Sequence, residues 1–237
     1  MDVVYPYIKD GSHWNENELR HSLRSLDKYF LNIGEVFIVG HKPSWTKGVV
    51  HIECDDPYPD NKGANIINKL IVACKDDQIS SDFLFMSDDQ YMLVPMRSKD
   101  IETYYVSNLK NQKLSKGNKF WMKCLKNMRS AMEREGLPCY NFEPHTPVII
   151  NKRKYWSTMM NYDYENTLYP TLSIYFNTVL SHHKPLPDNY RARFSKDEIS
   201  LDIISGKQFL YHNDLGLSYA LQQEIKRLFP KRCRFER

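Results

Sequence analysis

An alternation of strand-like and helix-like segments over the first ninety residues limits the folds that this chain can adopt. Short apolar runs typical of strands occur at Val3–Tyr7, Val36–Gly40, Val49–Cys54 and Phe83–Met86. Between them, residues 19–30 and 64–75 carry apolar side chains at three- and four-residue spacing, which is the period of an α-helix. Strand–helix–strand alternation predicts parallel strands with right-handed crossovers. The sequence therefore predicts an α/β fold with a mostly parallel, Rossmann-like open sheet flanked by helices.

The pattern becomes more helical after Pro95. It predicts helices over residues 117–135, 170–180 and 217–229, and short strands at 148–150 and 208–212. Residues 181–188 contain two prolines and no apolar period, which predicts a loop. No internal repeat or low-complexity linker interrupts the chain, so we expect one composite domain over residues 1–237, with a sheet-rich half (1–95) and a more helical half (96–237).

Composition excludes several classes of protein. With 41% hydrophobic and 26% charged residues the chain is globular rather than disordered. No apolar run reaches the roughly 20 residues that span a bilayer, and no signal peptide is visible, so no transmembrane segment is expected. The five cysteines form no Cys-x-x-Cys pair, which argues against a zinc ribbon or a disulfide framework and favours a cytoplasmic protein.

The charge balance leaves the type of partner open. Lysine and arginine total 33 against 29 acids, and this net charge of +4 is too small to diagnose nucleic-acid binding. Basic residues cluster at Lys152–Lys154 and in the last dozen residues. Either cluster could meet an anionic partner or form a solvated face.

The strongest functional signal is the apolar run Phe83–Met86 followed by Ser87-Asp88-Asp89. In open α/β sheets, ligands bind outside the carboxyl ends of the strands, and two carboxylates at such an end are suitable ligands for Mg²⁺ or Mn²⁺. A solvated turn is the alternative. A Gly-x-Gly-x-x-Gly fingerprint after the first strand and a Walker-type loop are both absent, so this half is not built for NAD or for ATP in a P-loop.

The order of these elements resembles the nucleotide-sugar-binding half of GT-A-type glycosyltransferases. Their DxD motif corresponds here to Ser87-Asp88-Asp89, and Lys62–Lys69 resembles the segment that precedes this motif. Ser87 stands in place of the first acid, so the two carboxylates are adjacent. Shorter stretches at 2–5, 144–147 and 228–236 resemble stealth-type sugar-phosphate transferases and small phage or capsule glycosyltransferases.

The resemblance implies a donor site. Mn²⁺ or Mg²⁺ held by Asp89 and Asp88 would bridge the phosphates of a nucleotide sugar, most simply a UDP-sugar. The donor-site residues implied on the segment before the motif are Lys62, Asn65 and Lys69. Those implied for the base and ribose, at the end of the first strand, are Tyr7, Asp10 and Gly11. A solvated helix face and a plain turn are the alternatives for the lysines and for the turn, respectively.

Candidate groups in the second half carry the rest of the chemistry. His145, between two prolines, could be a metal ligand, an acceptor-binding group or a general base, with a loop histidine hydrogen-bonded to the backbone as the alternative. His212 could supply a late metal ligand. Glu143, Asp163 and Asp214 are candidates for the catalytic base, and Glu143 is preferred only because it neighbours His145. His182, His183 and Lys184 lie in a predicted flexible loop, and with Arg191 and Arg193 they could close over the diphosphate; a plain polar connection is the alternative.

Sugar transfer to an acceptor hydroxyl is therefore the leading hypothesis, with residues 1–95 binding the nucleotide sugar and 96–237 the acceptor. Two alternatives remain: sugar-phosphate transfer of the stealth type, and a non-enzymatic nucleotide- or nucleic-acid-binding module. The acceptor could be a glycan, a lipid-linked sugar or a modified DNA base. By the same resemblance we expect the protein in a bacterial or phage-infected host cytosol. The oligomeric state is not predicted.

Overall fold

A five-stranded sheet with strand order β3-β2-β1-β4-β9 forms the centre of the computed structural model, which describes residues 1–8, 12–115, 119–196 and 199–237. Four strands run parallel: β1 (Asp2–Tyr7), β2 (Val36–Gly40), β3 (Val50–Ile52) and β4 (Asp82–Phe85). The edge strand β9 (Val148–Asn151) is antiparallel to β4. The predicted mostly parallel open sheet is confirmed.

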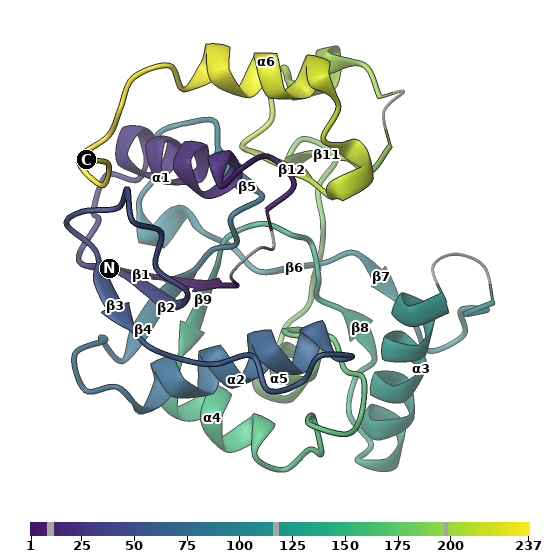
Figure 1. Ribbon diagram of the computed structural model, residues 1–237. Helices are drawn as coiled ribbons and strands as arrows, with labels where there is room; N and C mark the ends of the chain where they lie inside the picture. Colours follow the sequence, from purple (N-terminus) through teal and green to yellow (C-terminus); the bar gives the residue numbers. More distant parts are fainter. Residues whose placement is uncertain (9–11, 116–118, 197–198) are drawn as a thin grey trace.

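Helices cover both faces of this sheet because its strands are apolar on both sides. Alternate residues of β1 divide between two cores: Val3 packs with α1 (Asn17–Tyr29), and Val4 packs with α2 (Lys62–Lys75) on the opposite face. Figure 1 shows α1 on one side of the sheet and α2, α4 (Lys152–Met159) and α5 (Ser173–Val179) on the other. The core that contains Val4 also includes the apolar stripe of α3 (Lys119–Arg134).

A second, three-stranded sheet follows the acidic pair directly. Its strand order is β11-β12-β5, formed by β11 (Arg191–Phe194), β12 (Phe209–His212) and β5 (Gln90–Met92). The helix α6 (Tyr219–Leu228) covers one face of it through a separate apolar cluster that includes Phe194, Leu210 and Ile225. Because β4 ends and β5 begins on either side of Ser87–Asp89, the two acids lie where the two sheets meet.

The remaining elements are short. An antiparallel pair joins β7 (Ser107–Asn108) to β8 (Tyr140–Asn141), and a parallel pair joins β6 (Tyr104–Tyr105) to β10 (Lys184–Pro185). Three 3₁₀ turns occupy Ser98–Asp100, Leu201–Ile204 and Asp214–Gly216. In the part of the chain described, no helix is both long and apolar enough to cross a membrane, and all five cysteines are free thiols.

The two basic segments begin regular elements. Arg191 and Arg193 lie on β11, which pairs in parallel with β12 over four residues, and so follow the predicted loop over 181–188 rather than belonging to it. The basic cluster at Lys152–Lys154 starts α4, where the Asn151 side chain caps the helix by accepting from the Lys154 amide. The chain's last residues pack against α1, and buried Glu236 binds two arginines there.

Candidate functional site

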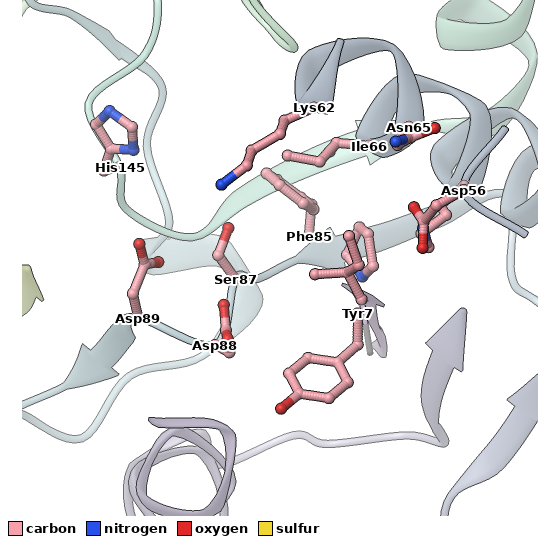
Figure 2. Close-up of a pocket in the computed structure, with 13 residues that line it drawn as sticks. Tyr7, Asp56, Lys62, Asn65, Ile66, Phe85, Ser87, Asp88, Asp89 and His145 are labelled. Carbon is pink, nitrogen blue, oxygen red and sulfur yellow. The ribbon is translucent and has the colours of Figure 1, made fainter. Parts of the chain in front are cut away.

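A cavity of about 370 Å³ opens at the carboxyl ends of β1 and β4, beside the start of α2 (Figure 2). Seven of the predicted site residues line it: Tyr7, Lys62, Asn65, Lys69, Asp88, Asp89 and His145. Its wall also contains Pro6, Ile8, Asp56, Ile66, Phe85 and Ser87. Asp10 and Gly11 fall outside the described residues. The structure thus gathers residues from both halves of the sequence around one space.

Asp88 and Asp89 are two adjacent carboxyl groups in the wall. Their turn is held by Gln90, whose side-chain oxygen accepts from the Ser87 amide at 3.3 Å. Burial, and then the charge of Glu18, raises the pKa of Asp88 to about 7. Burial, and then the charge of Asp88, raises the pKa of Asp89 well above its usual range. The pair therefore lies in an environment with excess negative charge.

A divalent cation fits this environment. Asp89 Oδ1 is buried and has no hydrogen-bond partner among the described residues, which is costly for a carboxylate oxygen unless a ligand meets it. No cluster of three or more His, Cys, Asp or Glu side chains within the described ranges is arranged to hold a metal. The protein would thus supply two carboxylates, leaving other positions to water and to ligand phosphates, as Mg²⁺ sites often do.

The two predicted lysines have different surroundings. Lys69 is buried and forms an ion pair with Asp56, in the loop after β3. It passes directly beside Gly40, where an added Cβ would lie 2.4 Å from Lys69 Cε and 2.2 Å from the Tyr7 carbonyl oxygen. Lys62, the first residue of α2, is exposed and makes no hydrogen bond or ion pair with another described residue. Its amino group points into the cavity toward the space beside Asp89 (Figure 2). Lys62 is therefore the lysine positioned to meet an anion.

Asn65 and Tyr7 shape the opposite wall. The Asn65 side-chain amide binds the Tyr58 backbone, accepting from its N–H at 3.0 Å and donating to its carbonyl at 2.9 Å. This pair of bonds fixes the loop that carries Asp56. The Tyr7 ring is buried and stacks on His41 with ring centres 6.3 Å apart. Asn65 thus lines the cavity with a side chain whose polar atoms are already used.

His145 closes the cavity on the side of the second sheet. Its backbone has φ 52°, and its ring lies flat on Tyr211, with centroids 4.2 Å apart and an interplanar angle of 8°. Burial, then the charges of Arg191 and Arg193, lowers the pKa of His145 to about 3. The imidazole is therefore neutral at physiological pH, and in this environment it is a hydrogen-bonding group rather than a strong base.

Glu143 and His212 are not brought to the cavity. One Glu143 oxygen accepts from the Leu172 N–H at 2.7 Å and from the Ser173 N–H and hydroxyl at 2.9 and 3.0 Å, so this carboxylate anchors the start of α5. The His212 ring is buried against Tyr91 and lies 3.0 Å from the Tyr91 hydroxyl. Only the His212 backbone N–H, among its described contacts, reaches the acidic turn, at 3.4 Å from the Asp89 carbonyl.

Sequence reasoning missed one group near the acids. Glu18 of α1 is buried, accepts from the His13 N–H at 2.9 Å, and adds negative charge beside Asp88. Asp56, which follows the third predicted strand, also lines the cavity, and its position after a strand end marks it as a candidate in the sequence. Its buried partner could not be identified without the fold.

Comparison with protein-family models gives no match, and no curated protein matches the sequence. Solved structures do match. An active-site mutant of LgtC superposes with a TM-score of 0.55 at 10% identity, covering 96% of this chain and 95% of that one. The galactosyltransferase LgtC in complex with donor and acceptor sugar analogs gives 0.54 at 9% identity, covering 99% and 98%.

A third match is the glycosyltransferase GlyE of Streptococcus pneumoniae TIGR4, with a TM-score of 0.51 at 10% identity. It covers 97% of this chain and 61% of GlyE, so the chain spans about three fifths of that protein. Identities this low establish the architecture alone. Together with the strand order and the position of the acidic pair, they show that this chain has the GT-A glycosyltransferase fold.

Proposed function

We propose that the protein is a metal-dependent glycosyltransferase that moves a sugar from a nucleotide-sugar donor, most simply a UDP-sugar, to an acceptor hydroxyl. One observation carries the proposal. A buried carboxylate oxygen of Asp89 and the amino group of Lys62, both without a partner among the described residues, lie around the same cavity. A ligand that combines a divalent cation with a diphosphate complements both groups. The related fold of LgtC, solved with donor and acceptor sugar analogs, supports this choice of ligand.

Each cavity residue then has a defined task. Asp88 and Asp89 hold Mn²⁺ or Mg²⁺, which when bound stabilises negative charge on the leaving diphosphate. Lys62 adds a point charge to the same group. The base and ribose occupy the end of β1 near Tyr7. There the Lys69–Asp56 ion pair and the hydrogen bonds of Asn65 to Tyr58 hold the loop after β3 in place. His145 offers a neutral imidazole to a sugar hydroxyl.

The donor site can be tested by thermal unfolding with Mn²⁺ and UDP. A ligand at a hundred times its Kd adds about 2.7 kcal/mol of stability, which for a chain of this size raises Tm by roughly 5–11 °C. Asp89→Asn should lose this Mn²⁺-dependent rise, and Lys62→Met should reduce it without changing the Tm of the free protein. Asp77→Asn, in an exposed turn outside the cavity wall, is the matched control.

An unchanged Tm of the wild-type protein in Mn²⁺ plus UDP would overturn the proposal and favour a non-enzymatic module. If binding is found, a panel of sugar nucleotides identifies the donor through Mn²⁺-dependent hydrolysis. Release of a nucleoside diphosphate agrees with sugar transfer. Release of a nucleoside monophosphate would instead mean transfer of a sugar phosphate.

A further inference from the structure

The strand β11 carries two arginines on one face. Arg191 and Arg193 are two residues apart, so their side chains point to the same side of the sheet, and they stand opposite Phe209 and Tyr211 in the β11–β12 register. The intervening Ala192 points to the other side, into the apolar cluster under α6. The fold therefore presents a pair of guanidinium groups next to Tyr211.

Neither arginine has an acidic partner within the described ranges. No hydrogen bond or ion pair joins either guanidinium to another residue there, and Arg191 Nη1 is buried without a partner. Burial, and then the neighbouring charge of Arg193, lowers the pKa of Arg191 to about 10. Arg24, by contrast, binds Glu236 through two nitrogens. A half-buried guanidinium beside a like charge is unfavourable unless an anion joins it.

The arginine pair lies outside the cavity proposed for the nucleotide. Neither residue lines that cavity, but the charges of both act on His145, whose ring is stacked on Tyr211. Burial, and then the charge of Asp89, raises the pKa of Tyr211, while Arg193 and Arg191 lower it, so this tyrosine is near both the acidic turn and the arginines. In the proposed function the donor diphosphate is already matched by the cation and Lys62. The anion that the arginines need is therefore on the second substrate.

We propose that Arg191 and Arg193 form a subsite for a carboxylate or phosphate group on an acceptor sugar, so that the acceptor is an anionic glycan. This inference rests on the proposed function. A single anionic group fits better than a nucleic-acid backbone because Asp89 and exposed Asp214 add negative charge near Tyr211, next to the arginines, and would repel a polyanion.

The test measures the affinity of the whole protein for small sugars by titration calorimetry. Two anionic sugars, methyl β-glucuronide and glucose 6-phosphate, are compared with neutral methyl β-glucoside. Each is titrated in the presence of Mn²⁺ and UDP and again in their absence. We expect the anionic sugars to bind about tenfold or more tightly than the neutral one, as charge-assisted bonds to two arginines imply. Arg191→Gln and Arg193→Gln should remove this preference and leave UDP affinity within about twofold. Arg153→Gln, on the exposed side of α4, should change neither, and the Tm of each variant verifies folding.

The outcomes separate the two proposals. Equal binding of charged and neutral sugars, including no binding of either, overturns the anionic subsite. Loss of UDP affinity in the arginine variants, with sugar preference unchanged, would assign them to the donor instead. Salt-sensitive binding of duplex DNA that Arg193→Gln abolishes would replace the glycan with nucleic acid. If the wild type shows the anionic preference without binding Mn²⁺ and UDP, the subsite stands and the proposed function fails.

Discussion

Exchanging Asp56 for asparagine should destabilise the protein more than exchanging its partner Lys69 for methionine. The two side chains form one ion pair, but the Lys69 side chain is 2% exposed and that of Asp56 is 25% exposed. Asp56→Asn leaves an ammonium group buried without its carboxylate. Lys69→Met leaves a carboxylate that water can already reach, and its methionine fills the space of the lysine stem.

The unequal exposure of the two side chains determines how much unfolding free energy each exchange should cost. Removing one partner of a buried pair costs about 3–5 kcal/mol when the remaining charge stays uncompensated. We expect about 3 kcal/mol for Asp56→Asn, or a Tm lower by roughly 6–12 °C. For Lys69→Met we expect about 1 kcal/mol. The double variant should lie within about 1 kcal/mol of the wild type, because no unpaired charge is then buried.

Urea unfolding at pH 7 measures all three variants, and the double-mutant cycle gives the coupling energy of the pair. Asp55→Asn and Lys75→Met are the controls, since both residues are exposed and match the exchanged residues in type. If Lys69→Met lost as much stability as Asp56→Asn, the argument from unequal burial would be wrong.

Two further predictions concern stability. Glu236 is buried with the arginines of α1, and their hydrogen bonds outweigh its burial to hold its pKa at about 2, below the usual 4.5. Glu236→Gln should therefore cost roughly 3 kcal/mol at pH 7. A carboxyl group whose pKa is lower in the folded state stabilises the fold fully only above its unfolded pKa. In urea unfolding, the stability difference between wild type and Glu236→Gln should therefore shrink as pH falls from 4.5 to about 2. A difference that does not change with pH would refute the stabilising role of the Glu236 charge. Gly40 has φ 110°, and a Cβ added there would meet the Tyr7 carbonyl oxygen. Gly206 has φ 70°, and an added Cβ would meet nothing within 4 Å. Gly40→Ala should therefore lower Tm clearly more than Gly206→Ala. Similar Tm values for the two glycine variants would contradict the close approach of Lys69 past Gly40.

The first half of the fold was predictable because its signals are local. The strands β1, β2 and β4 and the helices α1 and α2 all lie within a few residues of their predicted ranges. The spacing of apolar residues along each of these segments indicates directly which side chains are buried. The short strands β5 and β11 were not predicted, since three or four residues carry too little periodicity to be distinguished from loops.

The site was predictable to a similar extent. Seven of the named residues line one cavity. Tyr7, Asp88 and Asp89 meet there because parallel strands bring their carboxyl ends to the same edge of the sheet, and the three residues from Lys62 to Lys69 are contributed by α2. Glu143 was chosen for its closeness to His145 in sequence, and it does not share the cavity. The positive φ of His145 turns the chain, and Glu143 instead caps the start of α5, which comes about thirty residues later.

The sequence alone determined the parallel sheet and the acidic pair at its mouth, because apolar periodicity and a strand's last residues are local properties. Only the tertiary structure decided which charges are paired. It paired Lys69 with Asp56, left Lys62 facing the cavity, and placed on β11 two arginines that have no partner among the described residues. The physical reason is that an ion pair depends on distances between segments far apart in the chain, and no local pattern encodes these distances.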